Sequence, residues 1–169
     1  MKPIAIALAT AFVCALTASA IAANVPLAPP ADVMAAFSSF HEIDTLNGLP
    51  AEIRAGNFTL PSGKPLGGWV LAAPGGAWNP TDNVVDPSLP GRRLHFAGCN
   101  ASMCVLHYER GGIAHIHLVV TLVRKNGTWK ATWMAYGQPA MKDLAALRAL
   151  LENRSGANYS DQSPADVNY

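Results

Sequence analysis

Apolar and polar residues alternate along the second half of the chain in four runs, 94–99, 104–109, 113–124 and 129–136. Alternation with a period of two is typical of β-strands. The pairs Gly111-Gly112 and Asn126-Gly127 separate the last three runs, and such pairs favour two-residue hairpins because both central positions need a positive φ. The pattern predicts a four-stranded antiparallel meander.

Helical periodicity appears on either side of this meander. Residues 31–41 place Val33, Phe37 and Phe40 near one helical face. Residues 140–152 predict a second helix, whose apolar stripe needs a sheet to cover it. The stripe consists of Met141, Leu144, Leu147 and Leu151.

The remaining segments are irregular. Residues 52–60 and 68–73 have strand-like patterns, whereas 74–92 is crowded with Gly, Pro, Asn and Asp and is predicted to be a long surface loop. Together the elements predict an α+β fold, in which an antiparallel meander of four to six strands is packed by a C-terminal helix and a short N-terminal helix.

The start of the chain is typical of a secretory signal peptide. Lys2 precedes an uncharged apolar run, 4–16, which is too short to span a bilayer, and small residues follow it. We predict a signal peptide over 1–23, a single α+β domain over 24–152 and a disordered tail over 153–169. The mature protein is expected to be periplasmic or secreted, without membrane insertion after signal cleavage.

Cys99 and Cys104 flank a tight loop between two predicted strands. Residues directly opposed in an antiparallel pair lie at a Cα separation that a disulfide spans, and an exported protein meets an oxidising compartment. We therefore predict a structural disulfide. A redox dithiol lacks the Cys-x-x-Cys spacing that lowers a thiol pKa, and free thiols are the remaining alternative.

The turns also predict which residues share a face of the sheet. Pairing Arg110 with Ile113 and Lys125 with Thr128 gives one apolar face, the expected recipient of the C-terminal helix, and one mainly polar face. The apolar face carries Leu94, Phe96, Val105, His107, Ile116, Leu118, Val120, Leu122, Trp129, Ala131, Trp133 and Ala135. His107 is thereby predicted to be a buried, hydrogen-bonded histidine.

The polar face carries the strongest candidate for a site. His115 and His117 are two residues apart on a strand, so both imidazoles lie on one side, about 7 Å apart at Cα, and can reach one metal ion. No acidic residue falls on this face in the predicted register, so three good metal ligands are not visible. The predicted ligand-binding surface consists of His95, Tyr108, His115, His117 and Tyr136, with Trp78 from the long loop.

No catalytic residue is assigned. The run 107–110 contains a base, a phenol, a carboxylate and a guanidinium, but strand alternation separates them. Tyr108 and Arg110 point one way, and His107 and Glu109 the other. The following Gly111-Gly112 is explained as a turn.

Charge narrows the classes of function. The formal net charge is +1 and 14% of the residues are charged, which is no electrostatic footprint for nucleic acid. We predict an exported binding or interaction protein, rather than an enzyme, with an unknown protein or small-molecule ligand and no cofactor.

Two alternatives stay open. One is a metal-dependent enzyme or hydrolase that uses His115 and His117, for which Asp82 or Asp86 would have to approach from the long loop. The other is an inhibitor or immunity protein for a secreted enzyme. A carboxylate close to both imidazoles would favour the chemical alternative, and an open histidine face would favour binding.

Overall fold

The computed structural model describes residues 29–60, 63–65, 69–137, 140–153 and 159–162, so the predicted signal peptide lies outside the described residues. Four short helical segments come before β2 in the chain: α1 (Ala31–Ala36), η1 (Phe37–Ser39), η2 (Leu46–Gly48) and α2 (Ala51–Arg54). The strands are β1 (His41–Ile43), β2 (Phe58–Thr59), β3 (Arg92–Cys99), β4 (Met103–Arg110), β5 (Ile116–Lys125), β6 (Thr128–Gly137) and β7 (Tyr159–Gln162). Helix α3 (Leu144–Asn153) lies between β6 and β7 in the chain.

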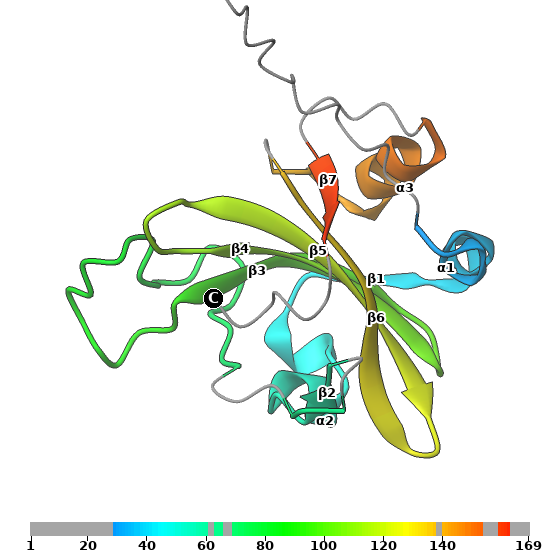
Figure 1. Ribbon diagram of the computed structural model, residues 1–169, viewed down its shortest axis with the longest axis horizontal. Coiled ribbons are helices and arrows are strands. Elements are labelled where there is room, and N and C mark those ends of the chain that lie inside the picture. Colours follow the sequence, from blue (N-terminus) through cyan, green and yellow to red (C-terminus); the bar gives the residue numbers. More distant parts are fainter. Residues whose placement is uncertain (1–28, 61–62, 66–68, 138–139, 154–158, 163–169) are drawn as a thin grey trace, which may run out of the picture.

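The strands form one seven-stranded sheet in the order β1-β3-β4-β5-β6-β2, with β7 also paired to β6 (Figure 1). Strands β3 to β6 are consecutive and antiparallel, which confirms the predicted meander. With the helices at both ends of the chain, the fold is α+β, as predicted. Strand β7 falls within the tail that we expected to be disordered, and it differs from that expectation because it pairs with the edge of β6.

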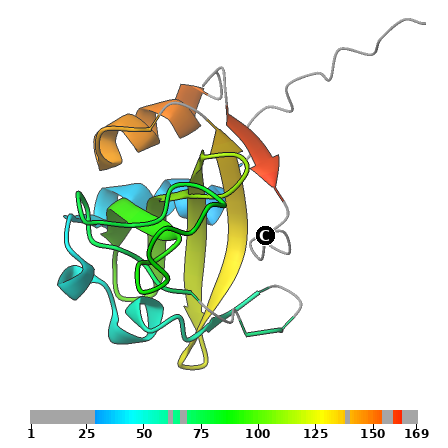
Figure 2. The same ribbon diagram turned by 90° about the vertical axis from the view of Figure 1, so that its left-hand side faces the viewer.

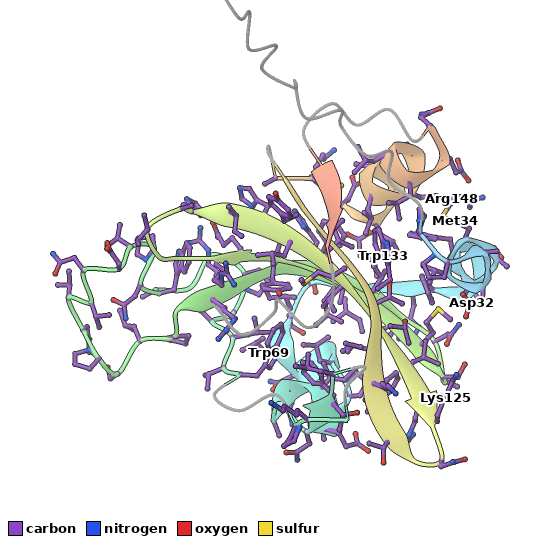
Figure 3. The ribbon with its side chains drawn as sticks, viewed as in Figure 1. Asp32, Met34, Trp69, Lys125, Trp133 and Arg148 are labelled. Carbon is purple, nitrogen blue, oxygen red and sulfur yellow. A yellow bond between two sulfur atoms is a disulfide. The ribbon has the colours of Figure 1, made fainter. Side chains whose placement is uncertain are left out.

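Both faces of the sheet are buried, each under a different part of the chain. Helices α1 and α3 lie on one side, and α2 lies on the other (Figure 1, Figure 2). Trp133 and Trp69 mark the two sides (Figure 3). The expected polar face is therefore a second core, because the N-terminal segments cover it.

We call the two clusters of buried residues the α3-side core and the α2-side core. The α3-side core contains Val33, Phe37, Phe96, Met103, Val105, Val119, Trp133, Ala135, Leu144, Leu147 and Leu151. From the sheet, the α2-side core contains Leu94, Ala97, Cys99, Cys104, Leu106, Tyr108, Leu118, Val120, Leu122, Trp129, Ala131 and Met134. The N-terminal half adds Ile43, Leu49, Ile53, Phe58, Leu60, Trp69 and Leu71 to it.

The predicted pairing of β4 with β5 is wrong, and the error reverses a face. Arg110 pairs with Ile116, not with Ile113, so the connection spans residues 111–115. Gly111 cannot serve as the tight turn because it packs under the long loop: its N–H donates to the Gly91 carbonyl over 3.0 Å. A three-residue shift moves Leu118 and its neighbours in β5 to the opposite face.

Two β-bulges place further residues on the face of the sheet opposite to the predicted one. The pairing of β3 with β4 skips His95, so Leu94 lies in the α2-side core and Phe96 in the α3-side core. A second irregularity beside Thr121 separates Ala131 from Trp133 in the same way. The predicted pairing of Lys125 with Thr128 is confirmed, and Asn126 and Gly127 have the positive φ values, 51° and 78°, of a hairpin turn.

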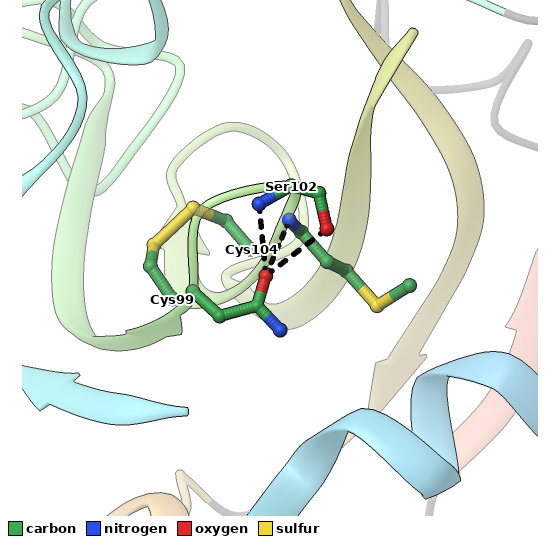
Figure 4. The surroundings of a disulfide bond; sticks show 5 residues. Cys99, Ser102 and Cys104 are labelled. Atoms are coloured by element: carbon green, nitrogen blue, oxygen red, sulfur yellow. Dashed lines mark hydrogen bonds between the residues drawn. A yellow bond between two sulfur atoms is a disulfide. The ribbon is translucent and has the colours of Figure 1, made fainter. Parts of the chain in front are cut away.

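The predicted disulfide is present at the other hairpin. Cys99 and Cys104 oppose each other with Cα atoms 4.2 Å apart. The Asn100 side chain closes the turn between them, since its Oδ1 accepts hydrogen bonds from the N–H groups of Ser102 and Met103 (Figure 4).

The strands predicted before the long loop are present only in part. Residues 52–60 contain α2 and only the two-residue strand β2. Pro50 has a φ of −49°, which suits a helix start, and Gly56 has a φ of +74°, which ends the helix. In the run 68–73, Ala72 makes an isolated bridge to Arg93. Among the described residues, no helix is both long and apolar enough to cross a membrane.

Candidate metal centre

Four of the five histidines of the chain gather at one end of the sheet. His95 comes from β3, His107 from β4 and His117 from β5, whereas His115 lies just before β5. The ring centroids of His95 and His117 are 5.1 Å apart, and those of His115 and His117 are 5.3 Å apart. The remaining histidine, His41, is an exposed residue of β1. The β-bulge between Leu94 and Phe96 helps to position these histidines, because it takes His95 out of the regular alternation of side chains along β3.

A buried carboxylate lies within this group. Glu109 is 2% exposed and pairs directly with His117 across β4 and β5. Its Oε2 lies 2.6 Å from Nε2 of His115, and its Oε1 lies 2.5 Å from Nε of Arg93. The expectation of a histidine face without an acidic residue is therefore wrong, because the true register brings Glu109 to the same side as His117.

Glu109 is held in its ionised form. Burial alone raises the pKa of this carboxyl, but hydrogen bonds from Arg93 and His115, with the nearby His95 and the charge of Arg93, bring the pKa below its ordinary value. A carboxylate only accepts hydrogen bonds, so Nε2–H of His115 donates to it. The group thus contains an anion with a donor on each oxygen.

His107 is a structural member of the group, as predicted. It is fully buried, and its Nδ1 lies 3.0 Å from the Leu118 carbonyl while its Nε2 lies 3.0 Å from the backbone N of Met141. A carbonyl can only accept and an amide N–H can only donate, which fixes the neutral Nδ1–H tautomer. Burial lowers the pKa of His107 to about 3, so the ring stays neutral.

His95 and His117 differ from His107 because each has a ring nitrogen with no hydrogen-bond partner among the described residues. The atoms are Nε2 of His95 and Nδ1 of His117, and both are buried. Burial lowers the pKa of both imidazoles, and the neighbouring Glu109 opposes this only in part. Neutral imidazole is the form that binds a metal ion.

Two overlapping trios have the spacing of a metal site. One is Glu109, His115 and His117, and the other is His95, His107 and His117; within each, the candidate ligand atoms lie within 4.8 Å of one another. The second trio requires a nitrogen of His107, and both nitrogens already hydrogen-bond backbone groups. In the first trio, a side-chain hydrogen bond already brings His115 and Glu109 together.

The long loop covers one side of the group. The Trp78 ring lies 5.3 Å from the His115 ring, and the Arg93 guanidinium lies 5.2 Å over the Trp78 ring. The side chains of His115 and Arg93 are 46% and 28% exposed, so solvent reaches the group beside this aromatic wall. The structure thus brings together four predicted residues: His95, His115, His117 and Trp78.

The two predicted tyrosines lie elsewhere. Tyr108 points into the α2-side core, where its ring contacts Trp69, and Tyr136 packs partly buried against the same core. The register error between β4 and β5 had placed Tyr108 on the histidine face. The irregularity beside Thr121 pairs Tyr136 with Leu118, on the face opposite to His117. The carboxylate near the histidines is that of Glu109, whereas Asp86 accepts hydrogen bonds from Ser88 within the loop.

Sequence reasoning missed Glu109 and Arg93. Alternation did place His107 and Glu109 on one face, and the missing information was the length of the connection to β5. Comparisons of this chain with protein-family models, with curated proteins and with solved structures find no match. The geometry of the site is therefore the basis for assigning a function.

Proposed function

We propose that this protein is a small exported binding protein whose ligand is a divalent transition-metal ion, held by Glu109, His115 and His117. The observation that carries the proposal is the buried Glu109 carboxylate, paired across the sheet with His117 and 2.6 Å from His115. Two imidazoles and one carboxylate are a ligand set that zinc and non-haem iron use in proteins.

Without a metal ion, the hydrogen bonds of the site leave a buried ring nitrogen unsatisfied, and this favours metal binding. A buried polar nitrogen without a partner is costly, and Nδ1 of the 7%-exposed His117 has none among the described residues. Coordination would engage an imidazole that otherwise lies buried beside a carboxylate. It would also replace the His115–Glu109 hydrogen bond, because both groups would then share the ion.

The ligand types indicate which ions to test. Imidazole and carboxylate suit Zn²⁺, Cu²⁺ and Ni²⁺, and the general order of affinity places Cu²⁺ above Ni²⁺ and Zn²⁺. Cys99 and Cys104 are joined in the disulfide, so they provide no thiolate for a soft ion such as Cu⁺. Export is supported by the predicted signal peptide and by this disulfide, which suits an oxidising compartment.

The test is a metal titration of the mature protein, prepared without a polyhistidine tag and stripped with chelator. Calorimetry and elemental analysis after dialysis against Zn²⁺, Cu²⁺ or Ni²⁺ are expected to give one tightly bound ion per chain. Glu109→Gln and His117→Ala are expected to weaken binding by 10-fold or more, whereas His41→Ala is the matched control and leaves it unchanged.

Retention of no stoichiometric ion by the wild-type protein would refute the proposal. Equal losses in His41→Ala and His117→Ala would also refute it, because binding would then reflect scattered surface histidines.

A further inference from the structure

We propose that the metal-loaded site binds an anionic oxygen ligand, a carboxylate or a phosphate, which the metal ion, Arg93 and His95 hold together. This inference rests on the proposed metal site. It defines the chemical class of the molecule that would bind to the ion. This molecule would also contact Arg93 and His95, which are not among the three metal ligands.

The first step is the number of ligands. Glu109, His115 and His117 provide three donor atoms. A zinc ion with three protein ligands keeps a further position for water or an external ligand, as catalytic zinc sites do. The side chain of His115 is 46% exposed, so this position is accessible from outside.

The second step is the balance of charge. Before metal binding, the negative Glu109 is matched by Arg93, whose Nε lies 2.5 Å from Oε1. Imidazole binds a metal ion in its neutral form, so His115 and His117 add no charge as ligands. A divalent ion therefore leaves about two positive charges in a largely buried group, and an anion is the ligand that compensates them.

The third step is the position of the donors. The two oxygens of Glu109 face different neighbours: Oε2 faces His115, whereas Oε1 faces Arg93 and lies 3.5 Å from Nε2 of His95. Nε2 of His95 has no hydrogen-bond partner among the described residues. Beside the carboxylate that would bind the ion there is thus an imidazole nitrogen able to hydrogen-bond a second ligand.

Arg93 has donors left for such a ligand. Its Nε donates to Glu109 and one terminal nitrogen donates to the Gly76 carbonyl over 3.4 Å, but a guanidinium carries five N–H groups. The planar group lies over Trp78, which keeps its orientation fixed. Planar, fixed donors are suited to the paired oxygens of carboxylate and phosphate.

The experiment uses protein that carries one equivalent of Co²⁺ or Zn²⁺ and no free metal. Inorganic phosphate and acetate are titrated separately, by calorimetry for both ions and by the visible absorption bands of Co²⁺. We expect saturable binding of at least one anion that shifts the Co²⁺ bands, with at least 10-fold weaker binding to metal-free protein. The two titrations show which oxygen ligand the site prefers.

Arg93→Met is expected to keep the metal ion and to lose about 10-fold or more in anion affinity. Arg93→Lys keeps a cation beside Glu109 but lacks the planar fork, so it tests the same point if Arg93→Met fails to fold. Arg124→Met, at an exposed arginine of β5 paired with Glu52, is the control and leaves anion binding unchanged.

Equal anion binding by the metal-free and metal-loaded forms would overturn the inference. So would the absence of any Co²⁺ band shift, or unchanged anion affinity in both Arg93 variants. These outcomes are distinct from failure of the proposed function, because that failure appears earlier, as protein that retains no metal ion.

Discussion

Glu109 and His117 face each other directly across β4 and β5. This pairing brings together two ligands of the proposed metal site from positions eight residues apart, and it depends on the five-residue connection between the two strands. A shift by one residue would move one partner to the other face of the sheet. We therefore expect the site to respond to the packing of Gly111, which lies at the start of this connection.

Gly111→Ala tests this dependence. A Cβ atom at Gly111 would lie 2.2 Å from the Asn79 carbonyl oxygen and 2.7 Å from the carbonyl carbon of Pro80, so the loop or the strand end must move. We expect a loss of about 1–3 kcal/mol in the free energy of unfolding, as for overpacked sites, and weaker metal binding. Urea unfolding and metal calorimetry measure the two effects.

Gly91→Ala is the matched control, because nothing lies within 4 Å of the added atom there. A Gly111→Ala protein with the stability and metal affinity of Gly91→Ala would contradict the proposed tethering of the connection by the long loop.

Stability should fall in acid because of His107. Its pKa is lowered by burial to about 3 in the folded protein, against about 6.5 in the unfolded chain, so the unfolded state binds more protons between these values. The contribution of the neutral ring is present above about pH 6.5 and is lost as the pH falls towards 3. His95, His117 and Glu109 face this ring and act on its pKa.

His107→Gln removes this titration. Between pH 7 and 4.5, the wild-type protein should lose about 2–3 kcal/mol more unfolding free energy than the variant. Chemical denaturation at both pH values measures the difference, with His41→Gln as the control that keeps the wild-type slope. Parallel pH profiles for wild-type and His107→Gln would show that the pKa of His107 does not differ between the folded and unfolded states.

We expect that the disulfide can be removed without loss of metal binding at the candidate centre. Cys99 and Cys104 lie at the end of β3 and the start of β4, whereas Arg93 and Glu109 pair at the opposite ends of these strands. Replacing both cysteines with alanine is expected to cost about 2 kcal/mol of stability, at the low end of the usual range because the bond closes a short loop. Metal stoichiometry is expected to remain unchanged at a temperature where the variant is folded.

Denaturant unfolding and elemental analysis check this prediction together. Loss of the metal ion from fully folded Cys99→Ala/Cys104→Ala protein would show that the hairpin end controls the site across the whole length of the strands.

The sequence predicted what local chemistry determines. Asn126 and Gly127 define a turn by their own conformations, and the spacing of Cys99 and Cys104 determines their pairing. The meander and the position of His117 on β5 followed from these signals. Glu109 was missed because its neighbours depend on how Gly111 packs against the long loop, which is a contact between distant segments.

Contacts between distant segments also explain why the tyrosines were misplaced and the second core was not predicted. A polar pattern on β4 looked exposed, yet Tyr108 is fully buried because Trp69 and other N-terminal residues cover it. His95 changes its surroundings through a bulge that no turn residue marks. Alternation identifies strands, whereas the partners of each face come from packing across the chain.

Trp78 provides an optical test of where the metal ion binds. The chain has four tryptophans, and Trp78 contacts His115 with ring centroids 5.3 Å apart. A paramagnetic ion such as Cu²⁺ quenches an indole at this distance, so the titration should show saturable quenching at one equivalent. Trp78→Phe should remove most of that change while keeping the ion.

Trp129→Phe is the matched control, because Trp129 pairs with Arg124 near the hairpin at the far end of β5. If Trp78→Phe kept the full saturable quenching and Trp129→Phe lost it, the ion would bind at that hairpin and not beside Glu109. Quenching that follows Trp78 would place the ion at the end of the sheet where the long loop meets His115.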